Sequence, residues 1–297
     1  KSSLKGKVEI PGSKSHTIRA LIVASLAEGS SELIRPLDSL DTRSCIGACR
    51  ALGAVIETGE SYLVQGTGGR LTIPDDVINV ANSGTTARLV AGMASLASPE
   101  GYTVITGDHQ TRNRLMEPLI TALNNLGASA YATRMNGKLP VVIRGRLRGG
   151  ETPIDGVTSQ FLSSLLLCSP MADGDTKITV NNLNEQPYVE MTLWWLNKQG
   201  IRYENSGLDY FEIPGRQKYT AFHEPISADF SSATFFLCAA AITDSELTLQ
   251  GLDMEDPQGD KRVIHVLKDM GARIDINPEG VTVRGGKIKG MEVDMND

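Results

Sequence analysis

The chain has 297 residues, 40% of them hydrophobic and 22% charged, and its formal net charge at pH 7 is −6. This length suits two domains better than one core, and the composition is that of a soluble globular protein. The acidic balance argues against a nucleic-acid coat protein. No apolar run reaches the ~18 residues of a membrane span, so we expect no transmembrane helix. An anionic substrate is not excluded, because its binding depends on local charge.

The first predicted element is a strand in residues 1–12, KSSLKGKVEIPG, and from this start we expect no signal peptide. A helix follows in SKSHTIRALIVASLAEG, and a strand follows it in SSELIRPL. A second helix ends at Gly53, and two more strands follow it in GAVIETGESYLVQG. The helices show a 3.6-residue apolar period, and the strands alternate apolar and polar residues.

The same order of elements recurs three times along the chain. The later first helices are NSGTTARLVAGMASLAS, TSQFLSSLLLCSPMADG and DFSSATFFLCAAAITDS, and the strands after them are GYTVITG, DTKITVNNL and SELTLQGL. The second helices end at Gly127, Gly200 and Gly271, so the four marker glycines are 74, 73 and 71 residues apart. Glycine just past the last helical residue is the usual left-handed cap. The sequence therefore predicts an α/β (α+β) fold of four β-α-β-α-β-β units, at 13–76, 77–150, 151–224 and 229–294. Which strand opens a unit stays open.

The four cysteines, Cys45, Cys49, Cys168 and Cys238, all lie in apolar helical surroundings. Cys45 and Cys49 share a helix face, but no further Cys or His completes the spacing of a metal site. We expect all four to be buried structural thiols in a reducing cytoplasm.

Each predicted first helix begins with small, hydroxyl-bearing residues: Ser13 and Ser15; Ser83, Gly84 and Thr85; Thr158 and Ser159; Ser231 and Ser232. A helix N-terminus offers unpaired N–H groups and a partial positive charge, so it can bind an anion. Plain N-capping is the alternative for each helix. Asp229 fits capping, because a carboxylate caps a helix but repels an anion.

Three of these helix starts carry further features of an anion site. Lys14 and Arg19 flank the first, Gly84 allows a ligand close to the backbone of the second, and Gln160 stands in the third. The loop TGDHQTRNRLMEP adds Arg112 and Arg114. Cations near a helix N-terminus oppose its dipole, so they do not stabilise the helix. Their presence makes sense if an anion binds between them and the helix. The pattern therefore predicts binding sites for phosphate or carboxylate groups.

The segments PGSKSHTIRAL, NSGTTARL, GDHQTRNRLMEPL, DGVTSQFLSSLLL and QPY occur in this order. Together they resemble the 5-enolpyruvylshikimate-3-phosphate synthases, the glyphosate-inhibited enzymes of the shikimate pathway, from about residue 8 to the end. The resemblance implies the enolpyruvyl transferase inverse α/β barrel of six units, three per domain, around a cleft. Four of the six units are then present. Residues 13–228 form one complete substrate-binding domain, and residues 1–12 with 229–297 form part of a second.

The resemblance also implies the reaction. The enolpyruvyl group of phosphoenolpyruvate is transferred to the 5-hydroxyl of shikimate 3-phosphate, phosphate is released, and no cofactor or metal is needed. This step lies on the cytoplasmic route to chorismate and the aromatic amino acids. The chemistry demands anion clamps, a proton donor and a base.

By resemblance, Lys14 is catalytic and bridges both substrates. The other shikimate 3-phosphate residues are implied to be Ser15, Arg19, Thr158, Ser159, Gln160 and Tyr188. Phosphoenolpyruvate is implied to contact Asn82, Gly84 and Arg114 together with Lys14 and Gln160. Arginine suits this task because its planar fork matches carboxylate and phosphate.

Two residues depart from the family pattern. Thr158 stands where the family often has Ser, which keeps the hydroxyl. Glu185 falls near a position where a Ser can face the phosphate, and we expect its carboxylate to point away. The acid–base carboxylates and further basic clamps are implied to lie in the two final units. Asp294 and Asp297 precede the matching helix start, and we expect them to be solvated.

Two alternatives stay open at this point. The sister transferase that acts on UDP-N-acetylglucosamine relies on a cysteine in the loop matching TGDHQTRNR, and no cysteine is there. The other alternative is a non-catalytic substrate-binding fragment that needs a separate C-terminal chain or associates with itself. We expect phosphoenolpyruvate and shikimate 3-phosphate as partners, with no nucleic acid and no membrane.

Overall fold

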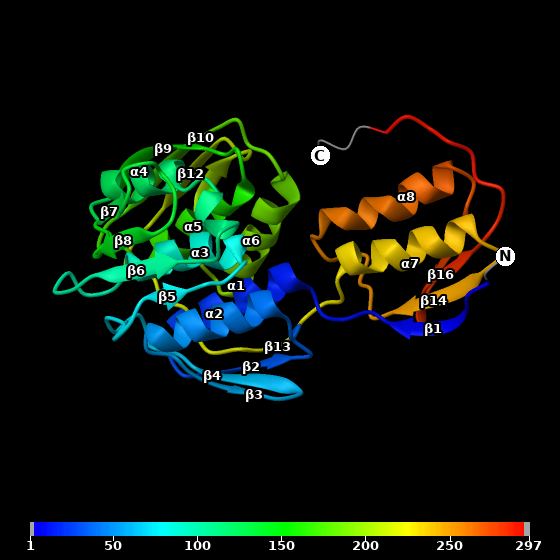
Figure 1. The fold of residues 1–297 in the computed structure, drawn as a ribbon, viewed down its shortest axis with the longest axis horizontal. Coiled ribbons are helices and arrows are strands. Elements are labelled where there is room, and N and C mark those ends of the chain that lie inside the picture. The colour runs from blue at the N-terminus through cyan, green and yellow to red at the C-terminus, as the bar shows by residue number, and fades with distance from the viewer. Residues whose placement is uncertain (1–2, 294–297) are drawn as a thin grey trace.

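The computed structural model describes residues 3–293, which form two lobes, each built of helices and four-stranded sheets (Figure 1). No helix in this range is long and apolar enough to cross a membrane. The larger lobe holds three sheets and the smaller lobe holds the fourth.

The first sheet has the strand order β13-β2-β4-β3. Its elements are α1 (Lys14–Leu26), β2 (Ser30–Ile34), α2 (Leu40–Ala51), β3 (Val55–Thr58), β4 (Ser61–Gln65) and β13 (His223–Pro225). The strand β13 pairs parallel with β2, and β2 and β3 pair antiparallel with β4.

The second sheet has the order β5-β6-β8-β7. Its elements are β5 (Ile78–Asn79), α3 (Gly84–Ala94), β6 (Thr103–Thr106), the 3-10 turn η1 (Thr111–Asn113), α4 (Glu117–Asn125), β7 (Ser129–Ala132) and β8 (Val141–Arg144).

The third sheet has the order β11-β12-β10-β9. Its elements are β9 (Gly150–Asp155), α5 (Ser159–Cys168), η2 (Ser169–Met171), β10 (Thr176–Asn181), α6 (Gln186–Lys198), β11 (Glu204–Ser206) and β12 (Tyr210–Ile213).

The fourth sheet, in the smaller lobe, has the order β1-β14-β16-β15. Its elements are β1 (Lys5–Glu9), α7 (Phe230–Ile242), β14 (Glu246–Gln250), η3 (Gly259–Lys261), α8 (Arg262–Asp269), β15 (Arg273–Asn277) and β16 (Gly280–Arg284).

All four sheets share one plan, which confirms the predicted repeat. An opening strand pairs parallel with the next, and the last two strands form an antiparallel pair beside it. The predicted units differ from the structure in one respect. The opening strand of the first sheet is β13, from residues 223–225, and that of the fourth is β1. The predicted end of the third unit at residue 224 is therefore wrong, because this short segment pairs with a strand nearly 200 residues earlier.

The marker glycines end their helices as predicted. Gly53, Gly127, Gly200 and Gly271 have φ angles of 108°, 93°, 64° and 100°. This left-handed backbone is the one that glycine adopts without strain.

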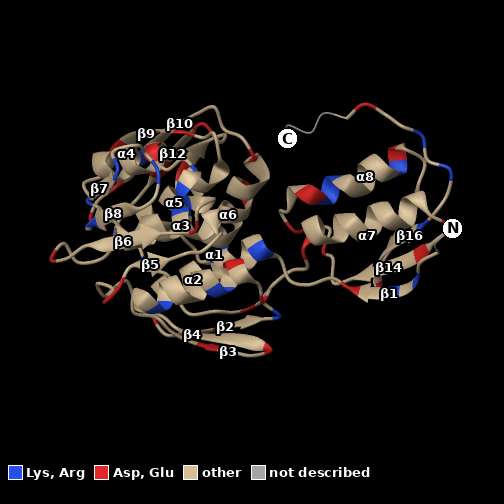
Figure 2. Cartoon of the chain, in the orientation of Figure 1, with Lys and Arg blue, Asp and Glu red and all other residues tan. Residues whose placement is uncertain are grey.

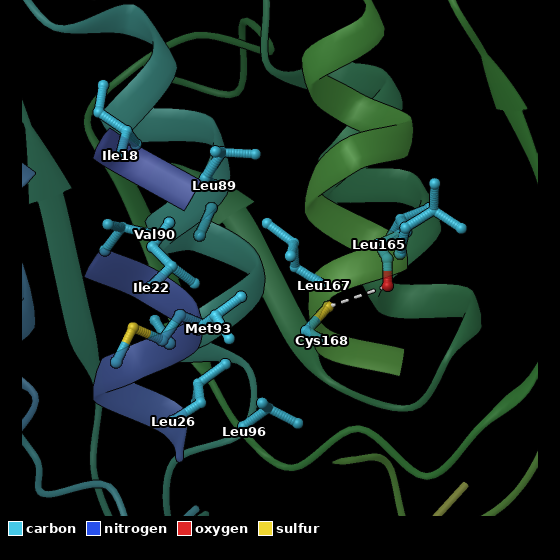
Figure 3. Packing of buried hydrophobic residues seen from close by; sticks show 14 of the residues in the cluster. Ile18, Ile22, Leu26, Leu89, Val90, Met93, Leu96, Leu165, Leu167 and Cys168 are labelled. Carbon is cyan, nitrogen blue, oxygen red and sulfur yellow. Dashed lines mark hydrogen bonds between the residues drawn. The ribbon is translucent and has the colours of Figure 1, made fainter. Parts of the chain in front are cut away.

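The core of the larger lobe is built where α1, α3 and α5 meet (Figure 3). Ile18 and Ile22 of α1 face Leu89 and Met93 of α3, and α5 lies on the other side of α3. Each of these side chains is fully buried, and burying one contributes about 1.5–3 kcal/mol. The packing fixes how the starts of these three helices sit relative to one another.

The cysteine thiols follow the prediction with one exception. Cys45, Cys49 and Cys168 are buried, whereas Cys238 is only half-buried, and all four are free. The Cys168 thiol donates to the carbonyl of Leu165 at 3.6 Å (Figure 3). Burial raises the pKa of Cys168 to about 12, so this thiol stays protonated and unreactive.

Two chain crossings join the lobes, and they run side by side. The amide of Ser13 donates to the carbonyl of Ser227 at 2.8 Å, and the amide of Asp229 donates to the carbonyl of Pro11 at 2.9 Å. Each lobe has its own apolar cluster. The assignment of residues 13–228, and of 1–12 with 229–297, to separate domains stays a prediction.

Candidate active site

Three of the four first helices are capped within their own first turn. Ser13 accepts from the amide of His16, Ser83 accepts from the amide of Thr86, and Asp229 accepts from the amide of Ser231. This is ordinary N-capping, in which a side-chain oxygen satisfies a helix N–H. These three side chains are therefore not free to bind an anion.

The start of α5 is different, because its donors converge on an acidic side chain from another loop. Thr158 Oγ1, the Ser159 amide and Ser159 Oγ donate to Oε2 of Glu185 at 3.1, 3.2 and 2.9 Å. The expectation that Glu185 points away is therefore wrong. A carboxylate is attracted to the positive end of a helix and to three converging donors. This arrangement has the geometry of an anion site.

Behind this helix start lies a group of basic side chains. Arg88, one turn into α3, donates to Oε1 of Gln160 at 2.7 Å and to the carbonyl of Leu115 at 3.3 Å. Its guanidinium lies 5.2 Å from the centre of the Phe161 ring. Burial and, to a lesser degree, the nearby charge of Arg114 lower the pKa of Arg88 to about 10, while the charge of Glu185 opposes this shift. Arg88, Arg114 and Glu185 are thus electrostatic neighbours.

Arg88 also has an incomplete hydrogen-bond set. Its Nε is buried and has no partner among the described residues. Because Oε1 of Gln160 already accepts from Arg88, the amide Nε2 of Gln160 is the end that remains to donate to a ligand. Arg88 was not predicted as a site residue. The signal was present, since NSGTTAR places it four residues after Gly84 on the same helix face.

The loop before η1 meets the start of α3. Asn82 Nδ2 donates to Oε1 of Gln110 at 3.2 Å. Asp108 accepts from the amides of Thr111 and Gln110, and these bonds lower the pKa of its carboxyl. Arg112 donates to the carbonyl of Gly107 and so stabilises the conformation of its own loop. Arg114 is exposed.

Gly84 is required for the approach of Arg114. A β-carbon at Gly84 would collide with the guanidinium of Arg114 and lie 3.0 Å from its Cδ. The structure thus brings the predicted phosphoenolpyruvate residues Gly84 and Arg114 into contact.

A cavity of about 290 Å³ lies between the lobes. Lys14, Ser15 and Tyr188 line it from the larger lobe, and Asp229 and Asp260 line it from the smaller lobe. In Figure 2 the start of α1 carries basic residues (blue). It faces the near ends of α7 and α8, where acidic residues (red) lie. The predicted catalytic Lys14 therefore lies in a polar cavity of mixed charge.

Tyr188 spans this cavity. Its hydroxyl donates to Oδ2 of Asp260 at 3.2 Å. Burial raises the pKa of Tyr188 well above its usual value, and Asp260 adds to the shift. Burial also raises the pKa of Asp260, and the negative charge of Asp229 adds to it. Asp260 was not predicted as a site residue, because its place in the cavity depends on how the two lobes meet.

Arg19 is placed differently from Lys14 and Ser15. It is 2% exposed and donates to Thr192 Oγ1, Ser163 Oγ and the carbonyls of Ser15 and Tyr188, at 2.8, 3.3, 3.1 and 2.9 Å. These bonds use four of the five guanidinium N–H groups. In this structure Arg19 ties α1 to α5 and α6 and holds the backbone of Tyr188. Its predicted contact with substrate stays a prediction.

His16 links the lobes behind the cavity. Its Nδ1 accepts from Trp195 Nε1 at 3.0 Å, and its Nε2 lies 3.2 Å from Oδ1 of Asp256 in the smaller lobe. All three side chains are buried. Because Nδ1 accepts, the proton of the neutral ring is on Nε2 and is donated to Asp256.

No three His, Cys, Asp or Glu side chains between residues 3 and 293 are grouped as a metal site would require. Asp294 and Asp297 lie outside the described residues.

Comparison with known proteins points to one enzyme family. The sequence profile of EPSP synthase (3-phosphoshikimate 1-carboxyvinyltransferase) matches residues 1–297. A 3-phosphoshikimate 1-carboxyvinyltransferase from Acetivibrio thermocellus is 54% identical over all of this chain and 70% of its own length. One from Methanothermobacter thermautotrophicus is 39% identical over 99% of this chain and 70% of its own length.

Solved structures give the same result. EPSP synthase from Acinetobacter baumannii superimposes with a TM-score of 0.83 at 28% identity, covering 98% of this chain and 67% of that one. These relatives support the resemblance to shikimate-pathway enzymes and not the UDP-N-acetylglucosamine alternative. The chain belongs to the EPSP synthase family of 3-phosphoshikimate 1-carboxyvinyltransferases.

Proposed function

We propose that this chain binds shikimate 3-phosphate and phosphoenolpyruvate for transfer of the enolpyruvyl group to the 5-hydroxyl of the shikimate ring. The observation that carries the proposal is the start of α5, where three donors converge on one anionic oxygen. Family membership supplies the reaction, and this helix start supplies a place for the 3-phosphate.

The other residues that contact shikimate 3-phosphate are assigned from this proposed position of the 3-phosphate at the start of α5. Thr158 and Ser159 receive the phosphate, Gln160 faces the ring, and Tyr188 closes over it. Lys14 and Ser15 reach the substrate from the cavity between the lobes. An ammonium group suits Lys14, because it can contact anions of both substrates as a point charge.

Phosphoenolpyruvate is assigned to the start of α3. Arg114 pairs with its anionic groups, Gly84 leaves the space that this pairing needs, and Asn82 borders it. Arg88 adds positive charge and fixes Gln160, so that the amide of Gln160 can donate between the two substrates.

The proposed reaction proceeds by addition and elimination. The methylene carbon of phosphoenolpyruvate gains a proton, and the 5-hydroxyl oxygen bonds to the adjacent carbon and loses its own proton. The resulting tetrahedral intermediate then expels inorganic phosphate as the methylene carbon gives up a proton. Clamps such as Lys14 and Arg114 stabilise the charge that builds up on the phosphate.

We also propose the setting in which these residues work. Residues 13–228 act as the substrate-binding domain, and residues 1–12 with 229–297 contribute to the second domain of the cleft. The enzyme works in the cytoplasm, on the route to chorismate.

Calorimetry with shikimate 3-phosphate tests the binding assignment. Lys14→Ala should weaken binding about 10- to 150-fold, since a hydrogen bond from a charged group contributes about 1.5–3 kcal/mol. Lys218→Ala is the control, because Lys218 is an exposed lysine. Equal affinity of Lys14→Ala and the unmodified chain would remove Lys14 from the site.

Release of inorganic phosphate from the two substrates tests the chemistry. We expect residues 1–297 to bind substrate without turnover. The resemblance assigns the acid–base carboxylates to the two final units of the family, and residues 1–297 correspond to only four of the six units. The Acetivibrio thermocellus relative is the positive control. Turnover near 10 per second by residues 1–297 would show that this chain holds the acid and the base.

A further inference from the structure

Glu185 stands out in the site, because an acidic side chain occupies a helix start whose other donors suit a substrate anion. The carboxylate is held through one oxygen, Oε2, by the Thr158 hydroxyl and by the amide and hydroxyl of Ser159. Thr158 is the N-cap residue of α5 and makes no side-chain cap bond to its own helix. Its hydroxyl is turned outward as a donor. Glu185 thus replaces the local cap that α1, α3 and α7 have.

The backbone shows how Glu185 reaches this position. Glu185 immediately precedes α6 and has a left-handed conformation, with φ 57° and ψ 42°. A residue with a β-carbon is disfavoured there. This conformation turns the side chain from the start of α6 toward the start of α5, and the three hydrogen bonds stabilise it.

The side chain can also leave this position. Glu185 is exposed, so its carboxylate can rotate into water without disturbing the core. The positive charges of Arg88 and of the N-terminus of α5 would then have no negative charge beside them from Glu185. An incoming anion would supply that negative charge.

We propose that the Glu185 carboxylate is a tethered competitor for the 3-phosphate position, and that it sets how tightly and how selectively this site binds phosphate. The proposal rests on the proposed function. A phosphate dianion and a carboxylate cannot share the same three donors, because like charges at this distance repel. Each binding event must therefore displace Glu185. The apparent dissociation constant then equals the intrinsic one divided by the fraction of molecules with an open site.

A phosphate group binds the donors at the start of α5 more strongly than the Glu185 carboxylate does. It carries close to two negative charges and three acceptor oxygens, whereas Glu185 offers one charge and binds through one oxygen. A ligand without phosphate gains nothing at this helix start. Glu185 should therefore weaken phosphate binding without affecting the ring, and it should exclude weaker anions.

The test is calorimetry of residues 1–297 and the variants Glu185→Ser, Glu185→Gln and Glu190→Gln. Each is titrated with shikimate 3-phosphate, with unphosphorylated shikimate and with inorganic phosphate. We expect Glu185→Ser to bind shikimate 3-phosphate about tenfold or more tightly than the unmodified chain, and to bind inorganic phosphate more tightly as well. Glu185→Gln, which keeps an acceptor but loses the charge, should fall between them. Shikimate affinity should not change.

Glu190→Gln is the matched control, since it removes the same charge from an exposed position on α6 and should leave all three affinities unchanged. Thermal unfolding checks that each variant is folded. Equal or weaker binding of shikimate 3-phosphate by Glu185→Ser overturns the proposal and leaves the proposed function intact. A parallel loss of shikimate affinity would show that Glu185 only holds the loop in place. Binding of shikimate 3-phosphate by none of the proteins would overturn the proposed function together with this inference.

Discussion

Gly84 is the residue at which one added methyl group should change the site most. In Gly84→Ala the new β-carbon collides with the guanidinium of Arg114, which is the flexible end of an exposed side chain and can move. Arg114 then leaves its position against the start of α3. Losing one charge-assisted contact should weaken phosphoenolpyruvate binding by about 1.5–3 kcal/mol. The dissociation constant for phosphoenolpyruvate, measured with shikimate 3-phosphate present, checks this.

Gly47→Ala is the control for this change. Gly47 is an exposed glycine inside α2, and a β-carbon there meets nothing within 4 Å. It should be neutral for binding and raise the free energy of unfolding by up to about 1 kcal/mol, because alanine favours helix. If Gly84→Ala binds phosphoenolpyruvate as well as Gly47→Ala does, Arg114 does not depend on the space at Gly84.

Asp260 should make stability depend on pH. Burial and Asp229 raise the pKa of its carboxyl in the folded state, so between the unfolded pKa, about 3.9, and this raised value the folded chain holds more protons. The free energy of unfolding therefore falls as pH rises through this window. Asp260→Asn removes the effect and still accepts from Tyr188. Its stability relative to the unmodified chain should grow from pH 4 to pH 7 in urea unfolding. Glu190→Gln should show no such trend, and a flat Asp260→Asn difference would contradict the prediction.

Residue types and spacing located helix starts and loops that carry the side chains of the proposed site, but they did not show which way each side chain faces. Lys14, Gly84, Arg114 and Thr158 lie at helix starts or in loops, where the chemistry of a residue indicates its role. Glu185 was misjudged because its direction depends on a left-handed backbone that the sequence does not reveal. Arg19 is buried because α5 and α6 both close over it, and this is a tertiary effect.

The helices α3 and α5 carry the two halves of the proposed site, so their separation matters for both proposed substrates. At Gly92 of α3, a β-carbon would lie 2.9 Å from the carbonyl of Ser164 and 3.1 Å from the sulfur of Cys168, both in α5. Gly92→Ala must push the helices apart, because one of these atoms is backbone. Overpacking of this kind typically costs about 1–3 kcal/mol of stability. It should also weaken binding of both substrates, since the starts of both helices move.

Two measurements check the helix prediction. Urea unfolding gives the loss of stability, and calorimetry gives the two affinities, with Gly47→Ala again as the control. Unchanged stability in Gly92→Ala would mean that the contact between α3 and α5 can relax without cost.

At the level of elements, local patterns predicted nearly the whole fold. Apolar periods located the helices and strands, and the four glycines located the repeat, because each signal is carried within a few residues. The placement of residues 223–225 in the first sheet was missed for a physical reason. The strand β13 has three residues, and its pairing with β2 is set by contact between distant segments, which a local pattern does not encode.

The two lobes are joined more tightly than two chain crossings alone would require. His16 donates to Asp256 across the junction and accepts from Trp195, and all three are buried. The hydrogen bond to His16 lowers the pKa of Asp256, although burial alone would raise it. Since Asp256 also accepts from the amide of Gln258, its charge is well satisfied. The junction beside the cavity is thus a structured hydrogen-bonded contact, and it holds Lys14 close to Asp229 and Asp260.

The smaller lobe leaves an apolar helix face uncovered. Phe235 and Ile242 of α7 are 78% and 66% exposed. Large exposed apolar side chains that share one helix favour association, and full burial of each contributes about 1.5–3 kcal/mol. We therefore expect residues 1–297 to self-associate through α7, with a dissociation constant that rises about tenfold or more in Phe235→Ser/Ile242→Ser. Sedimentation velocity over a concentration series measures this. Leu40→Ser is the control, because Leu40 of α2 is also 78% exposed but lies in the other lobe. A monomer at every concentration, or an equal effect of Leu40→Ser, would show that α7 is not the contact surface.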